Sequence, residues 1–336
     1  MLRDLRVSCS PHISKSRSTR SMMIDVIIGL VPAMAAAGYY FRIYALILIP
    51  TCVISAVVTE WLCNLIRKKE NSLGDFSAIV TGIILALSLP PRLPVWTAVI
   101  GSVFAIAIGK MVFGGLGANI FNPAMVGRTF LTASFGILMT TWTVPATINL
   151  TLPNISAENK IDARTQATPL ALSKEVIKGK NEIEIVNEQI KPAIIGEVGG
   201  CLGETSAIAL LLGGLYLLIR RTINFHIPFA VIVSAIAFTG IFYLIDSEKY
   251  AQPMFHLTSG GILLCAFFIA TDPVTAPLTP GGMWIFGIGI GTLTMLIRIA
   301  GEYPEGVMYA VLLMNGVRPL IDRMCKWVPA GGKPKS

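Results

Sequence analysis

Long runs of apolar residues with few or no charges recur along this chain, and they constrain the fold more than any other feature. Each run is roughly twenty residues, long enough to cross the hydrocarbon core of a bilayer as a helix. Only 14% of the 336 residues are charged and 54% are hydrophobic, so the chain has too little polar surface for a water-soluble globule. We therefore expect an all-α integral membrane protein.

About ten membrane-spanning helices are predicted, five on each side of a central polar segment. They fall at residues 22–40, 43–66, 77–89, 95–113, 124–141, 201–219, 227–245, 257–270, 283–299 and 307–321. The third is short and ends in the proline-rich stretch 88–94, which indicates a broken or re-entrant helix. The predicted parts are a cytoplasmic N-terminal segment (1–21), a first membrane repeat (22–142), an external polar segment (143–200), a second membrane repeat (201–323) and a cytoplasmic tail (324–336).

Positive charge sets the predicted orientation. The first twenty residues hold five basic side chains, which the positive-inside rule places in the cytoplasm. Counting loops from there assigns Arg67, Lys68, Lys69, Lys110, Arg220, Arg221, Arg323 and Lys326 to the inside, and Arg42, Arg92, Lys249 and Arg298 to the outside. We expect a multi-pass protein of the inner (cytoplasmic) membrane with both termini inside and the polar segment outside. The net charge of +8 thus reflects loop charges on one side and indicates no nucleic-acid partner.

A weak internal similarity relates the two halves. Ser88-Leu-Pro90, Lys110 and Gly127-Arg128 recur as Thr271-Asp-Pro273, Arg298 and Gly316-Val-Arg318. An odd number of spans before the polar segment would give the halves opposite orientations, and inverted five-helix repeats of this kind form a site near the midplane. Chance similarity between apolar helices is the alternative.

The polar segment contains Asp162-Ala-Arg-Thr-Gln-Ala-Thr-Pro-Leu170. Thr168 followed by Pro169 predicts a helix start, because a Thr hydroxyl caps free backbone N–H groups and Pro is tolerated at the first helical position. Residues 170–180 suit a short surface helix. A capped helix in an extramembrane loop is one interpretation of this stretch.

The same stretch, Thr165-Gln-Ala-Thr-Pro-Leu170, resembles the flavinylation motif of the RnfD and NqrB membrane proteins, which belong to the Rnf and sodium-pumping NADH:quinone oxidoreductase complexes. The chain length is closer to RnfD. The resemblance continues through Gly117-Ala-Asn-Ile-Phe-Asn-Pro-Ala124, Gly203-Glu-Thr-Ser-Ala207, Ala270-Thr-Asp-Pro-Val274 and Tyr303-Pro-Glu-Gly306. It implies an FMN bound to Thr168 through a phosphoester, with Thr165 and Ala167 as parts of the motif. Gln166 departs from the Gly often found in related motifs.

A phosphate on Thr168 would face the free N–H groups and the positive dipole end of a helix. Arg164 and Lys174 can add charge-assisted contacts to it. Arg128 can either hold a cofactor phosphate or neutralise a nearby acid. The resemblance also implies a second, non-covalent flavin such as riboflavin, but no stretch of the sequence assigns its site.

Charges within a bilayer are costly and usually face a partner or a cavity. The candidates for an ion pathway are Glu60, Asp75, Glu204, Asp272 and Asp322. Helix-end positions in headgroup water are the alternative for Asp75 and Asp272, and Glu204 is also expected to open a helix, where an acid complements the dipole. The six cysteines are scattered without a CxxC pair, so we predict no metal or Fe–S site, and we assign no catalytic residue.

The resemblance implies an electron-transfer component of an ion-translocating ferredoxin:NAD oxidoreductase of the Rnf type. It implies RnfA, RnfB, RnfC, RnfE and RnfG as partners and a flavin transferase for maturation. Substrate sites would then lie on those other proteins, in keeping with the absence of a GxGxxG fingerprint here. The alternatives are a stand-alone channel or solute transporter of urea-transporter-like architecture, and a purely structural membrane anchor.

Overall fold

The structure is a computed structural model that describes residues 18–68, 72–142, 168–179, 183–196, 198–204 and 206–325. The described residues form helices joined by turns and loops, with no strand among them. Thr165, Ala167 and Arg164 of the motif lie outside the described residues.

The first half begins with two long helices, α1 (Thr19–Phe41) and α2 (Ile43–Ile66). The Ser18 hydroxyl caps α1 by accepting a hydrogen bond from the Ser21 backbone N–H at 3.2 Å. The remaining helices of this half are η1 (Leu73–Asp75), α3 (Ser77–Leu87), α4 (Val95–Ile106), the π-helical turn η2 (Ala107–Met111), α5 (Pro123–Ser134) and α6 (Gly136–Met139). Helix α3 stops before Pro90, as predicted for a broken span.

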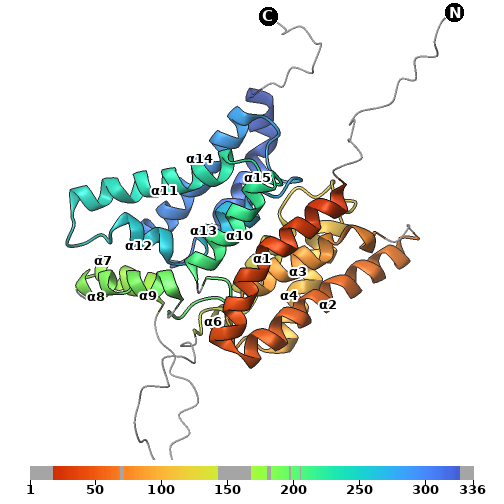
Figure 1. The fold of residues 1–336 in the computed structure, drawn as a ribbon, viewed down its shortest axis with the longest axis horizontal. Helices are drawn as coiled ribbons and strands as arrows, with labels where there is room; N and C mark the ends of the chain where they lie inside the picture. Colours follow the sequence, from red (N-terminus) through yellow and green to blue (C-terminus); the bar gives the residue numbers. More distant parts are fainter. Residues whose placement is uncertain are drawn as a thin grey trace, which may run out of the picture.

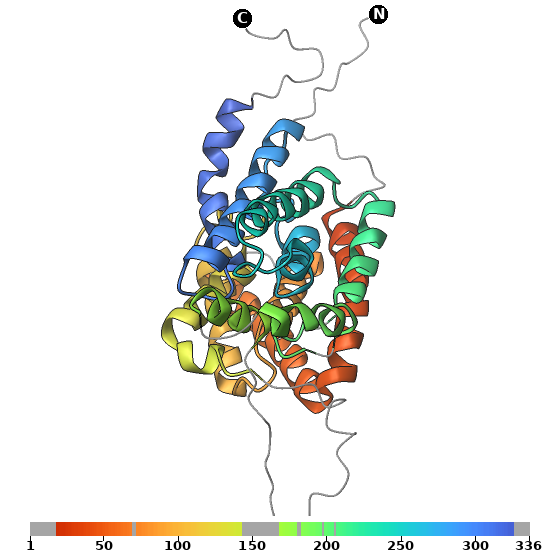
Figure 2. The same cartoon turned by 90° about the vertical axis from the view of Figure 1, so that its left-hand side faces the viewer.

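The second half follows three short helices, α7 (Pro169–Ile177), α8 (Ile183–Glu188) and α9 (Ile190–Ile195). Its helices are α10 (Ala207–Ile219), α11 (His226–Ile245), α12 (Pro253–Thr258), α13 (Ile262–Leu264), the π-helical turn η4 (Cys265–Ile269), α14 (Pro280–Ala300) and α15 (Val307–Met324). The start of α1 and the end of α15 lie at the same end of the bundle, whereas α6 to α9 lie in its opposite half (Figure 1 and Figure 2).

Four helices of the described chain, α1, α2, α11 and α14, are long and apolar enough to cross a membrane, and α3, α10 and the α4–η2 unit are apolar but shorter. Many of their large apolar side chains face outward; Leu46 on α2 is 67% exposed and Ile219 on α10 is 72% exposed. Such surfaces suit lipid or another membrane protein and not water. The expectation of an all-α, multi-pass membrane protein is therefore confirmed.

Three predicted spans differ from the observed helices. The fifth, predicted over 124–141, is divided at Phe135 into α5 and α6. The sixth is predicted to begin at Cys201, but α10 begins at Ala207, because the backbone N–H groups of Leu202 and Gly203 bond instead to the carbonyl oxygens of Leu89 and Leu87, at 3.1 and 2.7 Å. The eighth, predicted over 257–270, is broken between Thr258 and Ile262, where Gly260 has a φ of 75°.

The two halves meet through helix pairs, with α1 against α10 and α5 against α15. A small residue permits the first approach: a Cβ atom built on Gly213 of α10 would overlap the carbonyl oxygen of Gly29 on α1. Backbones therefore touch across the boundary between the halves.

Candidate functional site

Thr168 is the N-cap residue of α7. Its backbone is extended (φ −64°, ψ 155°), and its Oγ1 accepts a hydrogen bond from the Ala171 backbone N–H at 3.1 Å. Pro169 occupies the first helical position, where its missing N–H costs nothing. The predicted helix start is confirmed. The side chain is only 7% exposed, because α7 is docked on the bundle.

Below Thr168 lies a small pocket with about 400 Å³ of empty space. Its lining combines apolar residues from the α7 start and the α14–α15 loop with buried polar side chains. The main contributors are Trp142, Thr168, Leu170, Glu204, Ser259, Pro304 and Glu305. Leu170 fastens α7 over Gly260, where a Cβ atom would overlap the Leu170 side chain. The helix N-terminus is thus held over a mostly apolar pocket with a few buried polar groups.

Two buried arginine–glutamate pairs lie beneath this pocket. Arg128 Nη2 lies 3.5 Å from Glu204 Oε1, and Arg298 Nη2 lies 3.1 Å from Glu305 Oε2. All four side chains are buried. Of the two roles expected for Arg128, the structure therefore contains the contact with an acid. Arg128 Nη2 also donates to the Cys201 sulfur at 3.4 Å.

Glu204 is predicted to open a helix, and this prediction is wrong. The cap of α10 is Ser206, whose hydroxyl accepts a hydrogen bond from the Ala209 backbone N–H at 3.3 Å. Glu204 lies in the preceding turn, held inward by the pairing of Leu202 and Gly203 with the end of α3. That pairing, and not a helix terminus, sets the position of its carboxylate.

Lys174 contacts the bundle. Its Nζ donates to the Gly301 carbonyl in the α14–α15 loop, next to an exposed pair between Lys178 and Glu302. Partial burial lowers the pKa of Lys174, and the carboxylate of Glu302 opposes this shift. Lys174 therefore holds α7 to the bundle.

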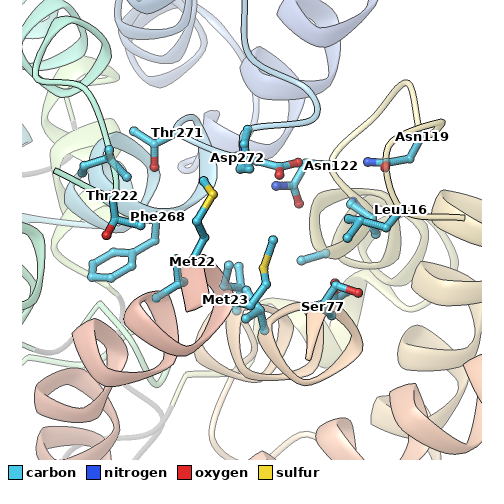
Figure 3. A pocket seen from close by; sticks show the side chains of 18 of the residues that line it. Met22, Met23, Ser77, Leu116, Asn119, Asn122, Thr222, Phe268, Thr271 and Asp272 are labelled. Atoms are coloured by element: carbon cyan, nitrogen blue, oxygen red, sulfur yellow. The ribbon is translucent and has the colours of Figure 1, made fainter. Parts of the chain in front are cut away.

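A second cavity, with about 730 Å³ of empty space, lies between the halves near the start of α1. Side chains from both halves point into it, with Met22 and Met23 from α1, Asn119 and Asn122 before α5, and Asp272 after η4 (Figure 3). Lys110, Ser77, Thr81 and Phe268 also line it. It thus offers amide, hydroxyl and carboxylate groups beside an aromatic ring and two thioethers.

The five acids predicted for an ion pathway are distributed over the structure. Glu60 and Asp75 belong to one network, since Lys110 Nζ bonds both Glu60 Oε2 and the Ser77 hydroxyl at 2.6 Å, and that hydroxyl donates to Asp75. Asp75 also caps α3 by accepting from the Ser77 N–H. The other three acids have no hydrogen bond to this network among the described residues. Asp272 accepts from Val274 and Thr275 beside the larger cavity, Asp322 pairs with Arg318 at 3.2 Å, and Glu204 faces the Thr168 pocket.

Two basic residues counted with the loops lie in helical segments, near the ends of the predicted spans 95–113 and 283–299. Lys110 belongs to η2 and is 1% exposed, and Arg298 belongs to α14 and is 2% exposed. Their burial is not predicted, because each pairs with a glutamate outside its own apolar run. Sequence reasoning also misses Ser259 and Glu305 as pocket residues. The useful signal is the matched occurrence of Lys110 and Arg298 in the two halves.

Comparison with known proteins identifies the family. The profile of the NQR2, RnfD, RnfE family matches residues 6–331. The chain belongs to this family. It is similar to the D component of the Na⁺-translocating ferredoxin:NAD⁺ oxidoreductase complex of Acetobacterium woodii, with 44% identity over 96% of this chain and 94% of that protein.

Two further relatives carry similar names. The D component of the proton-translocating ferredoxin:NAD⁺ oxidoreductase complex of Clostridium ljungdahlii is 42% identical over 97% of this chain and 96% of its own length. The D component of the ion-translocating oxidoreductase complex of Stutzerimonas stutzeri is 42% identical over 92% of this chain and 91% of its own length. Similar identities to a sodium-translocating and a proton-translocating relative leave the coupling ion open for this chain.

Proposed function

We propose that this chain is the RnfD component of an Rnf-type complex and relays electrons through an FMN bound covalently to Thr168. The complex would couple ferredoxin and NAD redox chemistry to the movement of Na⁺ or H⁺. One observation carries the proposal: the threonine of the family motif is the N-cap of a docked helix above a mostly apolar pocket that contains a few buried polar groups.

The residues around Thr168 suit the phosphate of such a cofactor. The N-terminal amides of α7 and its dipole favour a negative group esterified at Oγ1. Trp142, Leu170 and Pro304 provide apolar surface for a flavin ring. When bound, FMN supplies reversible one- and two-electron transfer. Lys174 and Leu170 would hold the attachment point at a constant place on the bundle.

The larger cavity suits a second, non-covalent flavin such as riboflavin. Its amide, hydroxyl and carboxylate groups can pair with the polar edge of a flavin ring, and Phe268 and the methionines can cover its faces. The mixed lining supports this assignment. The two sites share no lining residue.

We also propose that the chain crosses the inner membrane about ten times, as two inverted five-helix repeats. Equivalent helices pair across the boundary, α1 with α10 and α5 with α15, and each half contains a short buried helix followed by a proline-containing break. Lys110 and Arg298 are equivalent buried cations, each paired with a glutamate. In this arrangement both termini are cytoplasmic and Thr168 lies on the outer side of the membrane, where the other Rnf proteins and a flavin transferase would meet it.

The test uses the complex purified from its native host. Denaturing gels viewed under ultraviolet light and mass spectra of the peptide containing Thr168 should show one FMN adduct on the wild-type chain. Thr168→Val should remove both signals and Thr168→Ser should keep them, whereas Thr141→Val, the same change at a threonine outside the motif and the pocket, should leave the adduct on Thr168. An unmodified wild-type peptide would contradict the proposal and favour a transporter, which needs no flavin.

A further inference from the structure

The two arginine–glutamate pairs below Thr168 share one short backbone segment, Gly260-Gly261. A Cβ atom on Gly261 would lie 3.2 Å from Glu204 Oε1 and 3.8 Å from Arg128 Nη1. A Cβ atom on Gly260 would overlap Glu305 and Arg298. The two carboxylates are therefore neighbours, separated by a segment without side chains, and repel each other when both are ionised.

Glu305 is the carboxylate whose contacts favour the charged form. Its two oxygens accept from Arg298 Nη2 at 3.1 and 3.2 Å and from the backbone N–H groups of Gly261, Gly306 and Val307 at 2.9 to 3.2 Å. Bonds from a cation and from backbone amides favour the ionised state of a carboxyl group.

Glu204 lacks this support. Its Oε2 accepts one long hydrogen bond, from the Cys201 N–H at 3.4 Å, and its Oε1 has no hydrogen-bond donor among the described residues. Arg128, 3.5 Å away, gives charge without a hydrogen bond. The other ionisable groups around it are the Cys201 thiol and Glu305, with Arg298 and His256 beyond. A buried carboxylate with few donors gains most from taking up a proton.

Glu204 also faces the proposed redox site. It lines the same pocket as Thr168, together with Ser259, whose buried hydroxyl likewise has no partner among the described residues. Its side chain keeps 9% exposure. A proton on Glu204 would remove the negative charge beside Arg128, whose Nε is also unpartnered in the described structure. The uncompensated guanidinium would then favour negative charge at Thr168.

We propose that Glu204 is a redox-linked proton-binding site, which takes up one proton when an electron arrives at the group on Thr168 and releases it when the electron leaves. The electron comes from and returns to the redox partners of the complex, so this inference rests on the proposed function. The proton comes from water: one O–H bond forms on the Glu204 carboxylate and one O–H bond of hydronium breaks. Because the two events share one electrostatic field, each favours the other.

The test is redox-difference infrared spectroscopy of the purified complex, with in-gel fluorescence to measure flavin attachment. Reduction should produce a protonated-carboxyl C=O band that shifts in D₂O. Glu204→Gln should abolish the band while the flavin remains attached, and Glu204→Asp should retain it at a shifted position. Glu184→Gln on α8, an acid outside the pocket, is the matched control and should leave the band unchanged.

A band that persists in Glu204→Gln, or that never appears in a fully flavinylated wild-type complex, would overturn this inference and leave the flavin relay intact. A wild-type chain without flavin would instead overturn the proposed function. If Glu204→Gln fails to accumulate because Arg128 is left as a lone buried cation, Arg128→Gln/Glu204→Gln removes both charges together. The double variant should also lack the band, and its presence there would contradict the proposal.

Discussion

Lys110 Nζ lies 2.6 Å from Glu60 Oε2, and the two side chains are 2% and 0% exposed. The pair joins η2 to α2 and is extended by hydrogen bonds from Ser72 to Glu60 and from Lys110 to Ser77. An ion pair this deeply buried does not itself indicate high stability, because both charges lost their water. Removing either side chain, however, leaves the other as an unpaired buried charge.

Lys110→Met should therefore lower the stability of the folded protein by roughly 3–5 kcal/mol, because Glu60 remains as an unpaired buried charge. Glu60→Gln/Lys110→Met should recover much of the loss. Thermal unfolding in detergent measures both effects. Lys178→Met, which breaks the pair with Glu302 at 56% and 89% exposure, is the control and should change stability by less than about 1 kcal/mol. Equal losses in the single and double variants would contradict this expectation.

Gly213→Ala should disrupt the contact between α1 and α10, because the new Cβ would overlap the Gly29 carbonyl oxygen of the facing backbone. Gly38→Ala on α1 is a matched change, since nothing lies within 4 Å of its Cβ position. There the better helix propensity of Ala should stabilise by up to about 1 kcal/mol. Melting temperatures that fall for Gly213→Ala and hold or rise for Gly38→Ala would support the packing described.

Thr168→Asn should separate the two roles of this residue. Asn is a good N-cap but provides no hydroxyl for a phosphoester, so α7 should stay docked while the chain carries no flavin. Thr168→Val should lose the flavin and also about 1 kcal/mol of helix-cap stability. Hydrogen exchange at the Ala171 amide, compared between the two flavin-free variants, reports the cap. Equal exchange in both would show that capping contributes nothing here.

Asn315→Ala should lower the stability of the folded protein, because it removes a hydrogen bond next to the end of η4. Asn315 Oδ1 accepts from the Asn122 backbone N–H at 3.0 Å, and the Asn122 side chain donates to the Ile269 carbonyl. An unsatisfied buried N–H costs about 1–3 kcal/mol. Asn224→Ala, at an exposed position, should be neutral. Thermal unfolding of the two variants gives the comparison, and equal stabilities would contradict this expectation.

Hydropathy is sufficient to predict the all-α membrane class and most helix positions. The Thr168-Pro169 pair is sufficient to predict the start of α7, because capping depends only on adjacent residues. The start of α10 is misplaced because the N–H groups of Leu202 and Gly203 bond to a segment more than a hundred residues earlier. No local pattern encodes such a partner.

The pairing of the buried charges cannot be predicted from local sequence for the same reason. Arg128 and Glu204 are 76 residues apart, and Glu60 and Lys110 are 50 residues apart, so their pairing depends on how the helices pack. Burial of Lys110 and Arg298 is also hidden, since a single cation at the end of an apolar run resembles the edge of a membrane span. Only the repeat of these cations in both halves points to their importance.

The main-chain bonds from Leu202 and Gly203 to the end of α3 join the second half of the chain to the first without any side chain between them. A carrier that exposes its cargo alternately to each side must let its halves swing, and such a seam opposes that motion. Electron tunnelling has the opposite requirement, because its rate falls steeply when donor and acceptor drift apart. A bundle whose halves are joined by backbone hydrogen bonds keeps that distance constant. Electron transfer needs such a constant distance, whereas alternating access needs the halves to move.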